Sequence, residues 1–495
     1  MSEEHLHFHK FFRKRRSGVL LHPTSLPNAD GALGEDAYRF IRFLAEAGFT
    51  IWQMLPVNSI SGRNASPYQG TSVHAGNPWL ICIDKLCQES WFKDSSREMD
   101  EVRLLPLMEL IRFARTCFDT HAPLTERQSY LEFKQTYAWW LEDYGLFSAI
   151  KDHCNSDPWW LWPDELRRRE NKALDSFKIT NASQIEDYLF EQFIFFRQWN
   201  ELKQYANERG ILLFGDLPIL IAHDSVDVWT STDYFQLDQE GQPVAVAGVP
   251  PDYFSATGQR WGNPLYNWQA MAADKYHWWV ARLRTQLSLF DIVRLDHFRG
   301  FVSLWEIPAS CKTAMEGHWQ PVPGRDLLHA LTQEFGDLPI VAEDLGTISQ
   351  DVLDLRDEFG LPGMKVLLFA FDSDANNPYL PHNHDLKSVV YTGTHDNNTT
   401  LGWFYSLEQT AQQQVLEYLQ YPQEAMPWPL VITALRSVCP TAILPMQDIL
   451  GLDGSHRMNT PGTSEGNWRW RFGWEWVVPD LTRKLRRLNE IYARI

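Results

Sequence analysis

Four acidic side chains stand at or just beyond the carboxyl ends of short apolar runs, namely Asp216, Asp296, Glu343 and Asp396. The last three follow one another at intervals of roughly fifty residues, the length of one or two strand-helix repeats. Taken singly, such an acid usually caps a helix or forms a salt bridge at a strand end. Four that converge make a cluster of carboxyl groups able to transfer protons and to stabilise positive charge.

The polar neighbours of these acids favour glycosidic chemistry. Cleavage of an acetal needs one carboxylic acid to protonate the leaving oxygen and one carboxylate to support an oxocarbenium-like carbon. Arg294 precedes Asp296 by two residues and shares its strand face, so it should keep Asp296 charged and make it the better nucleophile. Apolar neighbours should keep Glu343 protonated as the acid, and Asp396 with His395 can hydrogen-bond sugar hydroxyls.

A metal site is the alternative for the same carboxylates, because clusters of Asp and Glu also bind Mg²⁺ or Ca²⁺. Arg294 would repel a cation there, which disfavours a metal. Because the three acids and Arg294 already supply the proton transfer, the nucleophile and the charge, we expect neither a metal nor an organic cofactor. The alternation His5, His7, His9 can also hold a metal, but we interpret it as a solvated chain end.

The elements that must position these acids alternate between apolar runs and amphipathic helices. Apolar runs near residues 19, 51, 212, 292, 340, 365, 389 and 442 predict eight strands. Helical patterns lie between them at about 37–48, 187–209, 274–289, 325–335, 349–359, 407–420 and 429–438. This order predicts an α/β fold, a (β/α)₈ TIM barrel, in which acids at strand ends meet in one cleft. An open doubly wound sheet competes, but no glycine-rich phosphate turn follows the first strand.

The length of 495 residues exceeds the roughly 250 that a bare barrel needs, so insertions must account for the excess. We expect one catalytic domain over 1–495. Within it, a mostly helical insertion should span about 58–210, and a long active-site loop region about 224–273.

The composition argues against several classes of partner. The formal net charge of −18 disfavours phosphate backbones and anionic lipids, so we expect neither nucleic acid nor a membrane as a partner. No run approaches the roughly 18–20 apolar residues of a membrane span, and the six cysteines form no Cys-x-x-Cys pair, which favours a cytoplasmic protein. The 22 Trp, 17 Tyr and 28 Phe leave aromatic rings to spare for apolar platforms in a cleft.

Longer motifs surround these residues and run almost from end to end of the chain. They are Arg16–Pro27, Ser66–Tyr68, Gly215–Ile219, Gly248–Pro264, Arg294–Gly300, Ala342–Gly346, Gly393–Asn397 and Asn459–Thr463. In these motifs the chain resembles the 4-α-glucanotransferases of the amylomaltase or disproportionating-enzyme type, glycoside hydrolase family 77, in the α-amylase clan.

The resemblance implies transfer of α-1,4-glucan segments between maltooligosaccharides, by a retaining double displacement with a covalent glycosyl-enzyme intermediate. It implies that Asp296 is the nucleophile, Glu343 the general acid/base and Asp396 the transition-state stabiliser. The implied substrate-binding residues are Arg294, His395, Asp216, Tyr68, Asp252, Gln259 and Trp261. The family also lacks a separate C-terminal β-domain, and the residues after the eighth predicted strand here are helical in pattern.

Two other functions remain open at this point. An amylase-type glucan hydrolase would use the same three acids and differ only in letting water resolve the intermediate. A non-catalytic glucan-binding protein would keep the aromatic residues without needing all three acids. The stretch 248–263, with its glycines, prolines and Trp261, predicts a lid that favours a glucan acceptor over water.

Overall fold

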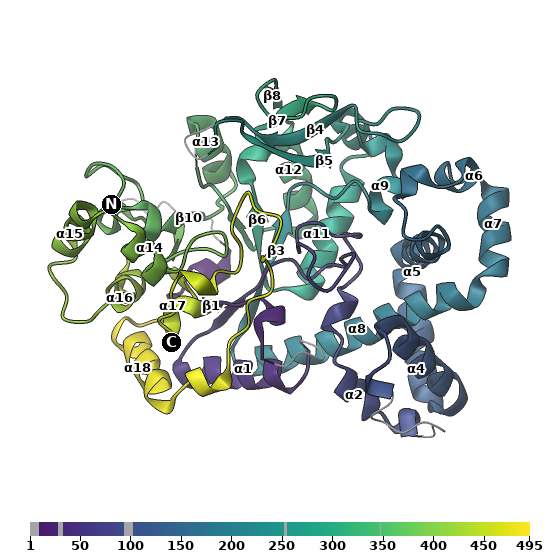
Figure 1. Ribbon diagram of the computed structural model, residues 1–495, viewed down its shortest axis with the longest axis horizontal. Coiled ribbons are helices and arrows are strands. Elements are labelled where there is room, and N and C mark those ends of the chain that lie inside the picture. Colours follow the sequence, from purple (N-terminus) through teal and green to yellow (C-terminus); the bar gives the residue numbers. More distant parts are fainter. Residues whose placement is uncertain (1–8, 28–32, 94–101, 252–254, 347) are drawn as a thin grey trace.

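The computed structural model describes residues 9–27, 33–93, 102–251, 255–346 and 348–495. At its centre lies a sheet in the order β10-β11-β12-β1-β2-β3-β6-β9, in which all paired neighbours run parallel. The strands are β1 (Arg16–Leu20), β2 (Ile51–Gln53), β3 (Leu212–Pro218), β6 (Ile292–Asp296), β9 (Ile340–Ala342), β10 (Gly363–Val366), β11 (Ser388–Tyr391) and β12 (Thr441–Pro445). The N–H of Ala342 donates to the carbonyl of Pro362 over 2.8 Å, which links the two end strands. All eight predicted strands are present, and the TIM barrel is confirmed (Figure 1).

Buried apolar side chains explain why these segments form a parallel sheet. β6 reads Ile-Val-Arg-Leu-Asp and buries its first four residues, and β12 buries all five of its residues. Strands buried on both faces are typical of parallel sheets covered by helices. Gly215 in β3 has a specific role, because a Cβ there would lie 2.2 Å from the ring of Phe290. Only glycine lets that ring pack against the strand, one residue before Asp216.

The predicted helices are present, with small shifts at their ends. α1 joins β1 to β2 and ends at Gly48, whose φ of 78° forms a left-handed cap. α1 spans Glu35–Ala47, and the others that precede barrel strands are α8 (Ala182–Glu208), α11 (His277–Leu289), α12 (Gly324–Phe335), α13 (Gln350–Glu358), α14 (Thr400–Ser406), α15 (Gln409–Tyr418) and α16 (Trp428–Arg436).

The insertion between β2 and β3 is helical, as predicted. It contains α2 (Ile83–Cys87), α4 (Leu107–His121), α5 (Leu124–His153), α6 (Asp164–Arg167), α7 (Asn171–Thr180) and the start of α8. Rings of α5 and α8 pack against each other, with Tyr130 on Phe193 at 5.0 Å between ring centroids. Among the described residues between 58 and 210 there is no β-strand, and the β-structure is limited to isolated bridges such as Asn58 with Gly76. Figure 1 shows α4 to α7 beside the barrel, on the side opposite α15.

A second, four-stranded antiparallel sheet in the order β5-β4-β7-β8 differs from the expected long loop over 224–273. Its strands are β4 (Ala245–Val249), β5 (Gln259–Pro264), β7 (Ser303–Pro308) and β8 (His318–Pro321). Short helices α9 (Val226–Thr230) and α10 (Trp268–Ala273) lie in the same region. The stretch 248–263 is therefore the end of a β4–β5 hairpin. Its glycines and prolines interrupt the alternation of apolar and polar residues that would predict a strand. β4 also forms hydrogen bonds with β7, which lies far along the chain.

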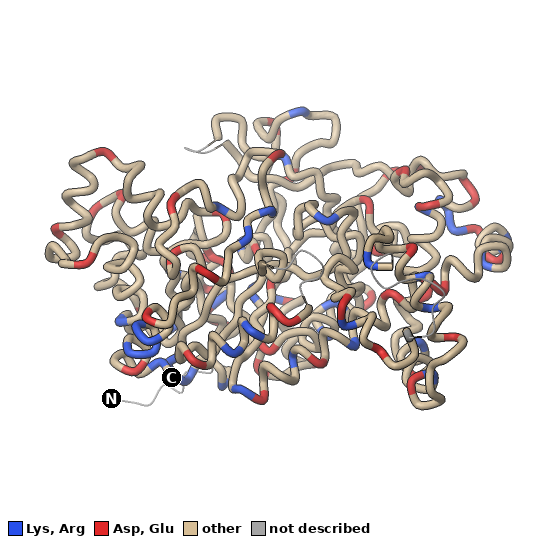
Figure 2. The backbone as a smooth tube through the Cα atoms, turned by 60° about the horizontal axis from the view of Figure 1, so that its bottom comes forward, with Lys and Arg blue, Asp and Glu red and all other residues tan. Residues whose placement is uncertain are grey.

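After β12 the chain forms α17 (Met446–Ile449), short 3₁₀ turns and α18 (Pro479–Ile491), and residues 446–495 contain no strand. α18 returns to the start of the barrel, where Asn489 donates to the carbonyl of Ala47 over 2.9 Å and accepts from Ser17 Oγ over 2.7 Å. Figure 2 shows acidic and basic residues interspersed along the backbone. In the described parts of the chain, no helix combines the length and the apolar character needed to cross a membrane.

Candidate active site

Arg294 lies between two carboxylates at the carboxyl end of the barrel. It belongs to β6, whose last residue is Asp296, and the side chain of Arg294 is only 6% exposed. Nη2 lies 2.6 Å from Asp296 Oδ1, while Nη1 donates to both carboxylate oxygens of Asp216, over 2.8 and 2.7 Å. The parallel register places Asp216 of β3 directly beside Arg294. The predicted pairing of Arg294 with Asp296 is thus present, and Asp216 shares the same guanidinium.

Asp216 is buried behind the cleft rather than in its wall. Its side chain is 1% exposed, and Tyr68 donates its hydroxyl to Oδ2 over 2.7 Å. Burial raises the pKa of Asp216, whereas the Arg294 guanidinium lowers it. The two short bonds from Arg294 favour the charged form, so we assign Asp216 as the carboxylate that fixes Arg294 and Tyr68.

Glu343 follows β9 directly and lines the same cleft as Asp296. Its Oε2 accepts from the N–H of His297 over 2.7 Å and its Oε1 from the N–H of Leu345 over 3.1 Å. Enclosure by protein raises the pKa of Glu343 well above its usual range, and the charge of Asp296 adds to this, against the opposing effect of Arg294. A Glu343 with a raised pKa and an Asp296 paired with Arg294 at 2.6 Å are the two environments that an acid and a nucleophile would need.

His395 and Asp396 lie on the loop after β11. The side-chain nitrogen Nε2 of His395 is 2.8 Å from the Tyr68 hydroxyl and 3.3 Å from Asp396 Oδ2. Because the Tyr68 hydroxyl donates to Asp216, His395 must donate from Nε2 to the Tyr68 oxygen, which selects that tautomer. Burial lowers the pKa of His395 and favours the neutral ring.

These residues surround a cleft of about 780 Å³ at the mouth of the barrel. Of the predicted site residues, Asp296, Glu343, Asp396, Arg294, Tyr68, Gln259 and Trp261 line it. Trp261 of β5 lies edge-on to His297 with 4.9 Å between ring centroids, and its indole N–H donates to Gln259 Oε1 over 3.2 Å. Asp216 and His395 stand behind the wall, and the predicted Asp252 lies outside the described residues.

Several lining residues were not predicted as site residues. Seven of them come from the C-terminal segment after β12, namely Asn459, Thr460, Pro461, Gly462, Thr463, Asn467 and Trp468. The ring centroid of Trp468 is 5.9 Å from that of Tyr68, and the main-chain N–H of Trp468 donates to the carbonyl of Met458 over 2.8 Å. The Asn459–Thr463 motif was the available signal, but nothing local to it indicates that it folds back onto the barrel mouth.

No group of three or more His, Cys, Asp or Glu side chains is arranged to hold a metal ion in the described residues. Of the alternating histidines that we interpret as a solvated chain end, His5 and His7 lie outside these residues.

Comparison with known proteins gives a consistent result. A family model described as 4-alpha-glucanotransferase matches residues 21–475. The 4-alpha-glucanotransferase of Thermus thermophilus is 45% identical over 97% of this chain and 99% of that protein. The one from Synechocystis sp. is 46% identical over 97% and 98%. The solved amylomaltase from Streptococcus agalactiae in complex with acarbose superposes with a TM-score of 0.91 at 36% identity, covering 97% of this chain and all of that one.

With an eight-stranded parallel barrel, a cleft of carboxylates at its mouth and relatives matched over nearly their whole length, the chain belongs to the 4-alpha-glucanotransferase family, glycoside hydrolase family 77, and is a glycosyl-transferring enzyme.

Proposed function

We propose that this cleft transfers α-1,4-glucan segments between maltooligosaccharides, with Asp296 as nucleophile, Glu343 as general acid/base and Asp396 as transition-state stabiliser. The observation that carries the proposal is the contrast between two neighbouring acids. Asp296 is paired with Arg294 at 2.6 Å, while enclosure raises the pKa of Glu343. Such a pair supplies a charged nucleophile and a protonated acid in one site.

In the first step, an Asp296 carboxylate oxygen attacks the anomeric carbon C1 of the donor glucan. The bond from C1 to the bridging oxygen breaks, and its electron pair stays with that oxygen, which takes the proton of Glu343. The shorter glucan leaves with a new hydroxyl group. The remaining segment is held as an ester of Asp296.

In the second step, the Glu343 carboxylate takes the proton of an acceptor hydroxyl, and the acceptor oxygen bonds to C1. The bond from C1 to Asp296 breaks, and its electron pair returns to the carboxylate. Two inversions at C1 give net retention. If water takes the place of the acceptor, the same steps produce hydrolysis.

The remaining polar residues act on the sugar at the reacting bond. Asp396 accepts hydrogen bonds from ring hydroxyls, and we propose that these strengthen as the ring flattens toward the transition state. Tyr68 provides an aromatic face beside the cleft and links His395 to Asp216 through its hydroxyl. Arg294 keeps its charge fixed between Asp216 and Asp296.

The hairpin at 248–263 supplies the groups that favour an acceptor sugar over water. Trp261 and Gln259 line the cleft, and Trp261 packs against His297, the neighbour of the proposed nucleophile. A glucan stacked on the Trp261 ring would close this side of the cleft, which a single water cannot do. We propose that Asp252, which lies between β4 and β5 in the sequence, binds the acceptor through its carboxylate.

Incubation with maltotriose tests the function directly. Transfer predicts glucose together with a ladder of longer and shorter glucans, whereas simple shortening would indicate an amylase-type hydrolase. No reaction would indicate a glucan-binding protein. The Asp296→Asn variant is the matched control, because it preserves shape and removes the nucleophile. The expected cytoplasmic location and the expected lack of nucleic-acid and membrane partners remain predictions from the sequence.

A further inference from the structure

The C-terminal segment 457–468 runs along the loop that carries His395 and Asp396. Three hydrogen bonds join the two segments. The N–H of Asn459 donates to the carbonyl of His395 over 3.2 Å, and Arg457 Nη2 donates to the carbonyl of Asp396 over 2.8 Å. The third and shortest runs from the Asn459 side chain, whose Nδ2 donates to Asp396 Oδ1 over 2.6 Å.

The third bond fixes the direction of the Asp396 carboxylate. A charged carboxylate only accepts, so the amide must turn its NH₂ group toward it. Oδ1 is held by Asn459, whereas Oδ2 lies 3.3 Å from His395 Nε2, a nitrogen that already donates its proton to the Tyr68 hydroxyl. The Asp396 side chain is still 45% exposed and lines the cleft. The carboxylate is therefore fixed by Asn459 while it stays accessible from the cleft.

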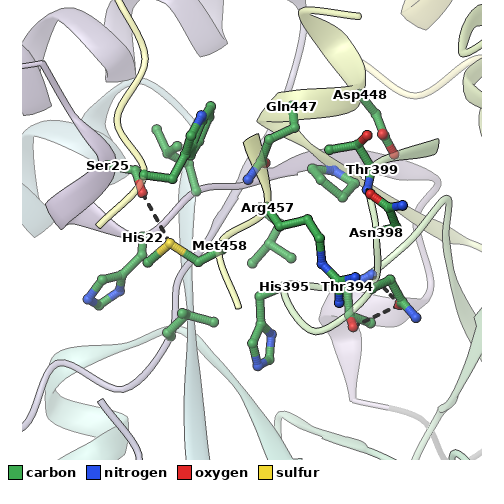
Figure 3. A pocket seen from close by; sticks show the side chains of 16 residues that line it. His22, Ser25, Thr394, His395, Asn398, Thr399, Gln447, Asp448, Arg457 and Met458 are labelled. Carbon is green, nitrogen blue, oxygen red and sulfur yellow. Dashed lines mark hydrogen bonds between the residues drawn. The ribbon is translucent and has the colours of Figure 1, made fainter. Parts of the chain in front are cut away.

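Arg457 connects the donor and the acceptor of that bond through their main chains. Its Nη2 donates to the carbonyl of Asp396, and its Nε donates to the carbonyl of Asn459 over 3.2 Å. Figure 3 shows Arg457 reaching from the C-terminal segment toward the loop that holds Thr394 and His395, beside a small cavity of about 30 Å³. One planar guanidinium thus sets the spacing between Asp396 and Asn459.

The loop around Asp396 does not hold this carboxylate by its own bonds. Thr394 donates from its N–H and its hydroxyl to Asn397 Oδ1, over 2.8 and 2.9 Å, and these bonds shape the turn. They do not contact the Asp396 carboxylate. The loop has no strand or helix around Asp396, so a carboxylate on it needs support from elsewhere.

We propose that Asn459 is a positioning residue for Asp396, and that Arg457 keeps Asn459 in place for that task. The inference rests on the proposed role of Asp396. It makes the C-terminal segment a working part of the catalytic site, although it lies beyond the last barrel strand. A carboxylate that must meet sugar hydroxyls in the transition state loses much of its effect when it can rotate.

The expected signature is a loss in kcat with little change in KM. Asn459→Ala should lower kcat for maltotriose by about 10- to 100-fold, the usual effect of one hydrogen bond to a charged group. KM should change by less than about three-fold, because a contact that matters in the transition state contributes little to ground-state binding. The exposed Ser464→Ala, in the same segment, is the matched control and should change neither constant.

A double-mutant cycle separates positioning from direct substrate contact, since Asn459 also lines the cleft. Asn459→Ala is measured in the parent and in Asp396→Ala, with an α-maltosyl fluoride donor so that slow variants remain measurable. If Asn459 acts through Asp396, its replacement has no further effect once that carboxylate is gone. An equal loss in both backgrounds, or an unchanged kcat in the parent, would overturn the inference.

Two further measurements protect the test. Arg457→Lys keeps a charge but cannot serve both carbonyls, so it should lower kcat in the parent and have no effect in Asp396→Ala. Thermal unfolding and near-ultraviolet circular dichroism show whether each variant keeps its fold. If Asn459→Ala does not fold, the Arg457→Lys cycle decides whether the C-terminal segment positions Asp396. If Asp396→Ala itself leaves kcat unchanged, the proposed function of Asp396 as transition-state stabiliser is disproved. That result is distinct from failure of the Asn459 assignment.

Discussion

Replacement of Arg294 by methionine should destabilise the protein in a way that depends on pH. Arg294 and Asp216 are 6% and 1% exposed, and two hydrogen bonds of 2.8 and 2.7 Å join them. Methionine preserves much of the side-chain volume but leaves Asp216 buried without its cation. Asp296 also loses its partner but is 27% exposed, so water compensates part of that loss.

The magnitude follows from the buried pair. Removal of one partner from a buried ion pair costs about 3–5 kcal/mol, because the other charge stays desolvated. The variant can avoid this cost by protonating Asp216, since burial raises the pKa of that carboxyl and Arg294 no longer lowers it. At acid pH the carboxyl is neutral in both proteins, and the difference in stability is small. As the pH rises, only the parent can ionise Asp216 beside a cation, so the difference grows by up to about 1.4 kcal/mol per pH unit.

Thermal unfolding of parent and variant, followed by circular dichroism from about pH 5 to about pH 8, measures this difference. The double variant Arg294→Met with Asp216→Asn removes the buried charge and should recover most of the lost stability. Arg284→Met is the control for loss of a surface ion pair. Arg284 pairs with Glu334, and their side chains are 52% and 44% exposed, so the change should be below about 0.5 kcal/mol.

Two results would refute the reasoning. A loss of stability in Arg294→Met that is constant across this pH range would show that an unpaired Asp216 is not its cause. Equal stability of the single and double variants at high pH would show the same.

Four further predictions concern activity. Asp296→Asn should abolish transfer from maltotriose while the midpoint of thermal unfolding stays close to the parent, and near-normal transfer would place the nucleophile elsewhere. Because enclosure raises the pKa of Glu343, kcat/KM should fall on the alkaline side of neutrality, where the acid loses its proton. A pH profile that already falls near pH 4, the value of an ordinary Glu, would contradict this assignment. Exhaustive chelation should leave activity unchanged, and a loss that a divalent cation restores would disprove the expectation of no metal. Trp261→Ala should raise the ratio of hydrolysis to transfer, measured as new reducing ends against transfer products, and an unchanged ratio would make the hairpin simple scaffolding.

Local sequence determined the barrel strands and the positions of the proposed catalytic acids. Each strand is a short apolar run buried by the sheet, and Asp296, Glu343 and Asp396 stand at the ends of such runs or in the loop that follows. Because all carboxyl ends of a parallel barrel open on one side, the position along a strand already predicts convergence. The spacing of two residues between Arg294 and Asp296 likewise predicted their shared face.

Other features depended on contacts between distant residues. The antiparallel sheet needed β7 to complete β4, so the hairpin at 248–263 had no local signature beyond its glycines and prolines. Asp216 was predicted to bind substrate, yet the barrel buries it behind the wall, as the partner of Arg294 and Tyr68. Only the closed barrel decides which of two strand-end acids faces the cleft.

The sequence by itself therefore determined the fold, the family resemblance and the acids that meet in the cleft, because periodic burial and residue type act over a few neighbouring positions. The tertiary structure decided how those acids are held. Tyr68 comes from the insertion after β2, and Asn459 reaches Asp396 from 63 positions further along the chain. Hydrogen bonds and desolvation depend on which atoms lie within a few ångströms, and for residues so far apart only the folded chain determines that distance.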